Sequence, residues 1–559
     1  MPLPETQSRL GNALESVRLP CPMMSRANNS PPAAFRITAW VVFGVTLALV
    51  VSARLRLLGL PLERDEGEYA YTGHLMLRGM APYQLAYSMK FPGTSAAYAV
   101  AMLLFGESGK GIHLGLIAVN LITVGLIFCV GRHLLGEIPG VAAATAYCVL
   151  SVMPYVLGTA AHATHFVALF GVAGIALLIQ TLDRRSTILI FASGSLFGLA
   201  VLMKQPGLLF ALFGMAYLFT HDYRARLKAQ EIARRLLFFV LGVGAPLIIT
   251  CLFLWKAGVF RRFWFWTVQY AAQYGSQVSL ADGIRIFGGH FFGVLGTAWP
   301  IWVIAVIGLV ACVLTPTFRT RAVFLITLTV FSAVAVCPGL YFRPHYFILL
   351  LPAISLLAGT AVAAGFQRAG NNANTIRLMT LLLFTASLGW PLWSEADFFF
   401  QRPLPEANRL INGANPFPES IRIGEYIREH SSPSDTIAVL GSEPQIYFYA
   451  GRRSATGYIY TYGLMEPQSY AHRMQQEMIN EIETARPKFL VLIVINKSWL
   501  AFSDSDLTIF RWAGSYCEAN YEEVGLINIT DQGTDYYLSG RSSSVTPTAE
   551  HILIFRRKT

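Results

Sequence analysis

The sequence predicts an all-α polytopic transmembrane domain of about eleven helices, followed by a C-terminal extracytoplasmic α/β domain. Of the 559 residues, 54% are hydrophobic and only 13% are charged, whereas soluble domains usually carry about a quarter charged residues. Long apolar runs also recur along the first part of the chain and then stop. We therefore expect an irregular N-terminal segment (1–34), a transmembrane domain (35–395) and an extracytoplasmic domain (396–559).

Each predicted membrane helix is an apolar run close to the roughly 20 residues that a span needs, with about 17 as the lower limit. The fifth, sixth and ninth runs are short. A further run, Ser95–Phe105, is too short to span, so we expect a re-entrant or juxtamembrane piece there. The predicted spans are Ile37–Ala53, Ile112–Val130, Ile138–Leu157, Phe166–Leu182, Ile188–Leu202, Gly207–Thr220, Leu236–Trp255, Phe291–Leu314, Val323–Val336, Tyr346–Gly365 and Leu378–Trp393.

The basic residues between these runs predict the orientation, because cytoplasmic loops are enriched in Lys and Arg. With a cytoplasmic N-terminus, the predicted inner loops hold most of them and the C-terminal domain lies outside. Arg54 and Arg56 are a local exception, and a second interpretation makes the first run a signal peptide ending at Ala53. The inner-loop residues are Arg132, Arg184, Arg185, Arg224, Arg226, Lys228, Arg234, Arg235, Arg319, Arg321, Arg368 and Arg377.

Charge and cysteine content exclude two other classes. The net charge of +11 does not indicate a nucleic-acid binder, because the basic residues lie between apolar runs rather than on one patch. The seven cysteines are scattered, mostly inside apolar segments, without the spacing of a metal site or a disulfide framework. We expect them to fill core or lipid-facing positions.

After Trp393, helical and strand patterns alternate, which predicts the small α/β domain. A turn at Gly441–Pro444 could present backbone N–H groups to an anion, but the domain lacks a nucleotide-binding glycine pattern. No group in this domain stands out as catalytic. The predicted helices are Ile421–Glu429, Pro444–Ala450 and Gln468–Thr484, and the predicted strands are Thr436–Leu440, Phe489–Val494 and Ile552–Phe555.

The first predicted outer loop carries the most informative motifs. It contains Arg64-Asp65-Glu66-Gly67-Glu68-Tyr69-Ala70-Tyr71, then Gly79-Met80-Ala81-Pro82-Tyr83, then Lys90-Phe91-Pro92-Gly93-Thr94. An isolated acidic cluster after a first span is often only a solvated loop. Ionisable groups at a membrane boundary are nevertheless costly, so this ordered set of acid pair, Pro-Tyr and Lys-x-Pro predicts a functional site.

This loop resembles the first outer loop of the GT-C glycosyltransferases, in the branch of protein mannosyltransferases and lipid A aminoarabinose transferases. The resemblance extends over about the first 210 residues of the chain. It implies a GT-C-like fold and transfer of a sugar from a polyprenyl-phosphate donor to an extracytoplasmic acceptor hydroxyl, usually with inversion. It also implies that Asp65 is the catalytic base and that Glu66 orients the acceptor or tunes Asp65.

The resemblance further implies a cationic site for the departing phosphate. Its candidates are Lys90, Lys204, Arg343 and His345, which all fall at predicted outer ends. Taken alone, Lys204 could simply extend to the interface and Arg343 could cap a helix end, but their convergence on one face favours the site. The expected substrate contacts are Tyr69, Tyr83, His162 and Tyr346.

The second predicted outer loop departs from the family pattern. Many relatives have an acidic residue there, sometimes linked to metal binding, whereas this loop contains His162 and His165 and no acid. A structural role for the two histidines is the simpler interpretation, so we expect no defined metal site, and a divalent cation stays open. The cluster Arg261–Trp266 suits either an interfacial helix beside the lipid or simple anchoring.

The expected partners are a polyprenyl-phosphate-linked sugar, a protein, lipid or glycan acceptor, and membrane lipids, without nucleic acid. The simplest setting is a bacterial inner membrane, with the active site and the C-terminal domain on the periplasmic side. In the resemblance, this domain caps the membrane site or helps to bind the acceptor. Two alternatives stay open: a polysaccharide polymerase or ligase, and a transporter of a lipid-linked solute, although transporters usually show inverted repeats and midplane charges.

Overall fold

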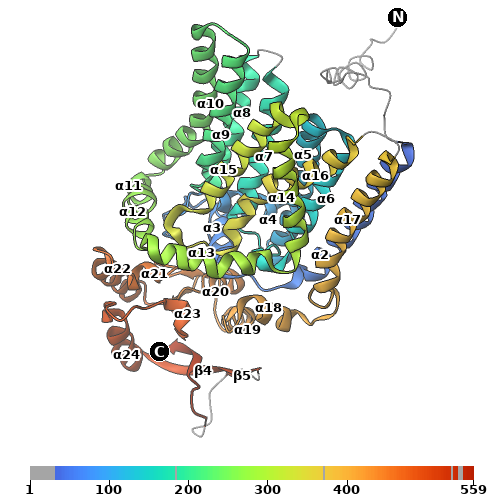
Figure 1. Ribbon diagram of the computed structural model, residues 1–559. Coiled ribbons are helices and arrows are strands. Elements are labelled where there is room, and N and C mark those ends of the chain that lie inside the picture. The colour runs from blue at the N-terminus through green and yellow to red at the C-terminus, as the bar shows by residue number, and fades with distance from the viewer. Residues whose placement is uncertain (1–31, 183–185, 369–371, 531–532, 539–544, 559) are drawn as a thin grey trace, which may run out of the picture.

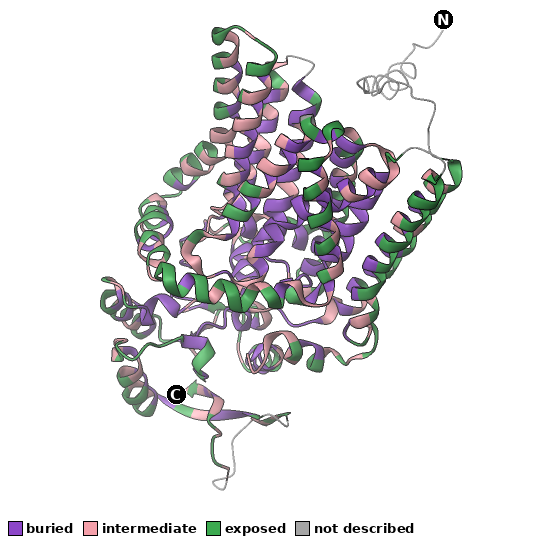
Figure 2. Ribbon diagram, viewed as in Figure 1, coloured by how far each residue is buried: buried purple, intermediate pink, exposed green. Residues whose placement is uncertain are grey.

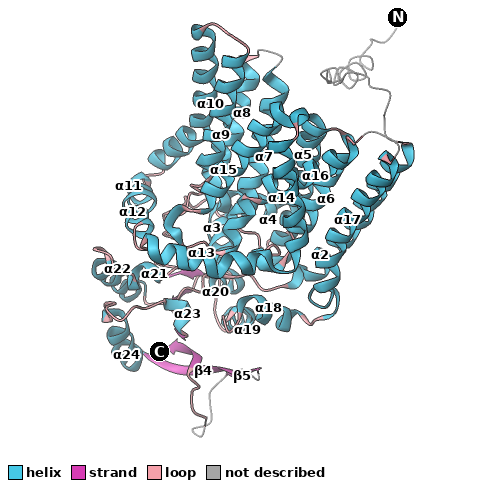
Figure 3. Ribbon diagram, in the orientation of Figure 1, coloured by secondary structure: helices cyan, strands magenta, loops and turns pink. Residues whose placement is uncertain are grey.

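The computed structural model describes residues 32–182, 186–368, 372–530, 533–538 and 545–558. Helices form a bundle at one end of the molecule, and the strands lie in a smaller domain at the other end (Figures 1 and 3). The predicted irregular segment lies outside the described residues up to position 31, and so do Arg184 and Arg185.

The bundle contains a helix at every predicted span. Six helical stretches in the described part of the chain are long and apolar enough to cross a membrane, and five shorter apolar helices accompany them. The bundle helices are α2 (Ala33–Arg56), α4 (Gly93–Phe105), α5 (Gly109–Leu135), α6 (Glu137–Leu150), α7 (Ala163–Leu182), α8 (Thr187–Met203), α9 (Gly207–Arg224), α10 (Ala229–Lys256), α14 (Trp299–Leu314), α15 (Arg319–Val336), α16 (Leu351–Phe366) and α17 (Ala373–Ser394).

Two predicted spans are interrupted. The predicted span Phe291–Leu314 is divided between α13 (Leu280–Leu295) and α14, because Gly296 adopts φ +42° and Pro300 lies in the first turn of α14. The chain of α13 runs across the lower edge of the bundle (Figure 1). The predicted span Ile138–Leu157 ends early, at Leu150, before a short turn that begins at Pro154.

Burial follows the expectation for a bundle in lipid. Buried residues fill the interior, while α2 and α10 expose much of their length (Figure 2). Along α10 the exposed side chains include Val240, Leu241, Ile248 and Phe253, which would face lipid tails. Arg54, the exception in the charge pattern, is buried, and its guanidinium donates to the carbonyls of Ser151 and Gly158.

The C-terminal domain is built on one sheet in the order β2-β1-β3-β6-β4-β5. Strands β1, β2 and β3 are parallel, and the other pairings are antiparallel. The strands are β1 (Thr436–Leu440), β2 (Arg453–Ser454), β3 (Phe489–Val494), β4 (Tyr521–Thr530), β5 (Gly533–Leu538) and β6 (Glu550–Arg557). The helices are α18 (Leu404–Asn412), α19 (Phe417–Glu429), α20 (Gln445–Ala450), α21 (Tyr462–Met465), α22 (Ala471–Ala485), α23 (Asn496–Trp499) and α24 (Thr508–Asn520).

The segment predicted as the first outer loop forms a helix, α3 (Arg64–Leu77), between the two domains. The guanidinium of Arg64 donates to the Ser442 carbonyl (2.6 Å) and pairs with the buried Glu443 (2.5 Å). On the next turns of α3, the Tyr71 hydroxyl accepts from the Ser454 amide (2.7 Å). These contacts attach the helix that carries Asp65 to the C-terminal domain.

We expect Arg64→Met to lower the free energy of unfolding by about 3–5 kcal/mol, because it leaves Glu443 charged and buried without a cation beside it. Thermal unfolding of the purified protein in detergent measures this change. Arg285→Met is the matched control, since the Arg285 side chain is 80% exposed and pairs with the exposed Asp282. An equal effect of the two substitutions would show that the Arg64–Glu443 pair does not hold the domains together.

Candidate active site at the start of α3

A capping box fixes the first turn of α3. The Glu63 carboxylate accepts from the Glu66 amide (2.9 Å), and the Glu66 carboxylate accepts from the Glu63 amide (3.1 Å). Asp65 lies between them in the first helical turn, where the helix dipole favours a negative charge. The sequence thus positions Asp65 through its two neighbours.

Asp65 belongs to a cluster of buried and partly buried charges. The ammonium group of Lys90 lies 2.8 Å from Asp65 Oδ1 and 2.6 Å from Glu68 Oε2. The Tyr460 hydroxyl donates to Asp65 from 3.4 Å. Burial alone would raise the pKa of Asp65, but the charge of Lys90 holds that pKa well below its usual range. Burial lowers the pKa of Lys90, but Asp65 and Glu68 together keep it well above normal.

Two further cations approach Asp65 from other elements. Lys204 follows α8, and its ammonium group lies 4.0 Å from the centre of the Tyr346 ring. Arg343 precedes η7 (Pro344–Leu349), and its guanidinium lies 5.7 Å from the centre of the Tyr341 ring. Among the described residues neither cation forms an ion pair. Both are therefore available to an anion.

Burial lowers the pKa of Lys204 to about 7. The negative charge of Asp65 opposes this shift, whereas the positive charges of Lys90 and Arg343 add to it. Lys204 therefore changes its charge near neutral pH and would gain a proton when an anion binds beside it.

Two stacked histidines complete the polar cluster. The rings of His162 and His345 lie 4.0 Å apart with an angle of 10° between them. Burial lowers the pKa of His162 to about 4 and that of His345 well below its usual range, so both rings are neutral at pH 7. Donor atoms of Asp65, His162 and His345 lie within 4.8 Å of one another. In the described part of the chain, His162 Nε2 has no hydrogen-bond partner, so the three residues could hold a divalent cation.

These groups surround a cavity of about 250 Å³ between the bundle and the C-terminal domain. Six of the residues predicted from the sequence line this cavity, namely Asp65, Lys90, Lys204, Arg343, His345 and Tyr346. Trp266 and Tyr270, from the π-helical segment Phe265–Tyr270, form part of its wall. The predicted basic-aromatic segment Arg261–Trp266 therefore reaches the site through Trp266.

Four predicted residues lie behind the cavity wall. The Glu66 carboxylate accepts from the Ala161 amide (2.6 Å) and lies 3.1 Å from His113 Nε2. Tyr69 packs under the Lys90 ammonium group, and the Tyr83 hydroxyl donates to the Lys90 carbonyl (2.7 Å). The fourth, His162, stacks on His345 as described above. The four side chains thus support residues that line the cavity.

Several groups at the site were missed by sequence reasoning. Burial and the charges of Asp65 and Glu66 raise the pKa of Glu63 to about 8. The C-terminal domain contributes Tyr460, Tyr462 and Glu466 to the cavity. The run Tyr458-Ile459-Tyr460-Thr461-Tyr462 was the one available signal, because three tyrosines in five residues are unusual for a turn.

We expect Lys90→Met to lower the free energy of unfolding by about 3–5 kcal/mol, because Asp65 and Glu68 would face each other without the cation. Lys110→Met is the control, since Lys110 is exposed at the start of α5. Thermal unfolding in detergent compares the two variants. Equal stability of Lys90→Met and the wild type would contradict the described charge cluster.

The chain resembles known proteins in part of its sequence and in its architecture. Residues 90–250 match the family of dolichyl-phosphate-mannose-protein mannosyltransferases. ArnT from Cupriavidus metallidurans in the apo state has a TM-score of 0.55 at 15% identity, over 93% of this chain and 98% of that one. The same protein bound to undecaprenyl phosphate has a TM-score of 0.53 at 16% identity, over 92% and 99%.

A third solved structure is the Archaeoglobus fulgidus oligosaccharyltransferase AglB in complex with an inhibitory peptide and a dolichol-phosphate. Its TM-score is 0.53 at 12% identity, over 91% of this chain and 75% of that one. No curated protein sequence matches the chain. The family match and the shared architecture confirm the predicted fold: the chain is a membrane protein with the fold of the GT-C glycosyltransferases.

Proposed function

We propose that this protein transfers a sugar from a polyprenyl-phosphate donor to an acceptor hydroxyl, with inversion at the anomeric carbon. The observation that carries the proposal is the meeting of the Asp65 carboxylate with three cations, Lys90, Lys204 and Arg343, in a single cavity. Glu68, which pairs with Lys90, and Glu466 line the same cavity. Transfer from a lipid phosphate needs a base for the acceptor and positive charge for the leaving phosphate. The undecaprenyl phosphate bound to ArnT supports this class of donor.

Asp65 serves as the base in this proposal. Its pKa is held low by Lys90, so the resting carboxylate is a weak base. A donor phosphate beside Lys90 would also interact with the Lys90 ammonium group. Lys90 would then lower the pKa of Asp65 less than it does in the resting site. Donor binding thus raises the basicity of Asp65 at the moment when the acceptor hydroxyl must lose its proton.

Lys204 and Arg343 receive the departing phosphate. Neither has an acidic partner among the described residues, so neither must break an ion pair to bind the donor. Preorganised charge of this kind is effective because little reorganisation is needed as charge develops. His345 and Tyr346 complete the donor side, and a divalent cation on Asp65, His162 and His345 would add positive charge there.

Glu66 acts as a positioning residue. Its carboxylate accepts hydrogen bonds from the backbone amides of Glu63, just before Asp65, and of Ala161 in the bundle. Tyr69 and Tyr83 similarly position Lys90 rather than contact substrate. The acceptor approaches from the side of Tyr460 and Tyr462, so the C-terminal domain helps to define it. In a bacterial inner membrane this side is the periplasm.

We expect Asp65→Asn to reduce sugar transfer by about 100- to 10,000-fold, the range for loss of a general base. The assay follows radiolabel from a panel of undecaprenyl-phosphate sugars in membranes that contain equal amounts of each variant. Asp282→Asn, at an exposed carboxylate outside the cavity, is the control. Full activity of Asp65→Asn would exclude Asp65 as the base, and an inactive wild type would favour a polymerase, ligase or transporter.

The charge of Lys204 predicts a pH dependence of donor binding. Its lowered pKa, about 7, means that the ammonium form is lost as the pH rises through neutrality. We therefore expect affinity for undecaprenyl phosphate to fall above pH 7 in the wild type. In the Lys204→Arg variant the guanidinium keeps its charge well above neutral pH. The affinity of this variant for undecaprenyl phosphate, relative to that of the wild type, should therefore increase with pH.

Binding in nanodiscs between about pH 6 and pH 8.5 measures this difference. The phosphate itself gains charge near pH 6, and the comparison of the two proteins cancels that contribution. Parallel pH profiles for wild type and Lys204→Arg would show that Lys204 does not contact the phosphate.

A further inference from the structure

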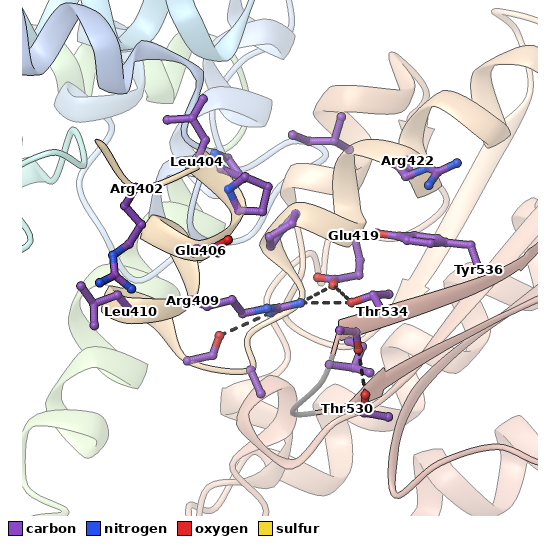
Figure 4. A pocket seen from close by; sticks show the side chains of 18 of the residues that line it. Arg402, Leu404, Glu406, Arg409, Leu410, Glu419, Arg422, Thr530, Thr534 and Tyr536 are labelled. Atoms are coloured by element: carbon purple, nitrogen blue, oxygen red, sulfur yellow. Dashed lines mark hydrogen bonds and ion pairs between the residues drawn. The ribbon is translucent and has the colours of Figure 1, made fainter. Parts of the chain in front are cut away.

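A second cleft, of about 1010 Å³, lies between α18 and α19 on one side and the β4–β5 hairpin on the other (Figure 4). Gly59 and Pro61, just after α2, form part of its wall. None of its described lining residues belongs to the cavity around Asp65. Because α18 follows α17, the last membrane helix, the cleft lies where the C-terminal domain meets the bundle. The proposed transfer chemistry does not use it.

One polar atom in this cleft needs an explanation. Glu419 is 1% exposed, and its Oε1 accepts from Arg409 and from the Thr534 hydroxyl. Within the described residues its second oxygen, Oε2, has no hydrogen-bond partner. A buried carboxylate oxygen without a donor costs free energy. A ligand hydroxyl in the cleft would supply the missing donor.

Three arginines, Arg402, Arg409 and Arg422, line the same cleft. Arg422 is exposed on α19, and its guanidinium lies 4.3 Å from the centre of the Tyr536 ring, which orients it. Arg402 pairs with Asp397, whose side chain is 54% exposed. An exposed pair of this kind is weak, so an incoming anion can replace Asp397. The planar guanidinium matches the geometry of carboxylate and phosphate groups.

Most of the remaining wall is apolar, although the exposed Glu406 also lines it. Leu404, Pro405, Pro418 and Ile421 line it beside the charged groups. A sugar ring presents C–H groups on its faces and hydroxyls at its edges, so it can contact this wall and Glu419 together. Arg409 neutralises Glu419, which allows an anionic ligand to bind beside the carboxylate.

We propose that this cleft binds an anionic polyhydroxyl group beside the membrane. An acidic group of the ligand contacts Arg422 or Arg402, which lie at opposite ends of the cleft (Figure 4), and a hydroxyl between them donates to Glu419 Oε2. Two sources carry this chemistry, an acidic glycan and the headgroup of phosphatidylglycerol. Binding here is independent of the proposed transferase, because the two sites share no described lining residue.

Calorimetric titration of the full-length protein in phosphatidylcholine nanodiscs tests the proposal. Tetragalacturonate is the anionic probe, and maltotetraose is the neutral probe of equal length. We expect tetragalacturonate to bind at least about tenfold more tightly, a difference well within reach of one or two guanidinium contacts. The tetragalacturonate titration is then repeated in nanodiscs in which phosphatidylglycerol replaces half of the phosphatidylcholine. This comparison distinguishes an acidic glycan from a lipid headgroup as the natural ligand. Loss of glycan binding assigns the site to the lipid headgroup, and unchanged binding assigns it to glycans.

Two variants localise the binding. Arg422→Gln removes an exposed cation, and Ala414→Trp fills the cleft without changing its charge, so neither should impair folding. We expect each to weaken tetragalacturonate binding by at least about fivefold at an unchanged melting temperature. Arg428→Gln, on an exposed face of the same helix outside the cleft, should stay within about twofold of the wild type. Equal binding of both sugars, absence of any binding, or insensitivity to Ala414→Trp would overturn the proposal.

Discussion

The buried charges of α3 are the constraint on which the rest of the structure depends. Arg64 pairs with Glu443 in the C-terminal domain, Glu66 bonds the Ala161 amide in the bundle, and Asp65 pairs with Lys90. A buried charge without a partner is very costly, so these contacts must form together. Together these contacts fix the position of α3, and in that position Asp65 faces the space between the domains.

The position of α3 then determines the electrostatics of the cavity. Lys90 holds Asp65 in its ionised form, while Lys204 and Arg343 stay without acidic partners among the described residues. The cavity therefore holds the cations Lys90, Lys204 and Arg343 beside the carboxylates of Asp65, Glu68 and Glu466. The basicity of Asp65 depends on what else Lys90 contacts. Such a site favours the binding of an anion at Lys204 and Arg343 and of a proton donor at Asp65. This is the combination that a phosphate leaving group and an acceptor hydroxyl provide.

Sequence reasoning found the parts of the molecule whose signals are local. Strands Thr436–Leu440 and Phe489–Val494 have the predicted bounds, and every predicted span contains a helix. Lys204 and Arg343 could be placed near Asp65 because membrane topology brings outer loops to one face. The helical nature of α3 was missed, since its charged residues resemble a solvated loop. The contribution of Tyr460 depends on a contact with Asp65, from which it is separated by 395 positions in the sequence, and no local pattern reports such a contact.

The most direct test of this account is the structure of the protein in nanodiscs with bound undecaprenyl phosphate, determined by electron cryomicroscopy. We predict that the phosphate contacts Lys204 and Arg343 and that Lys90 moves toward it from Asp65. A phosphate bound elsewhere, with the Lys90–Asp65 pair intact and the cavity without lipid, would contradict the account.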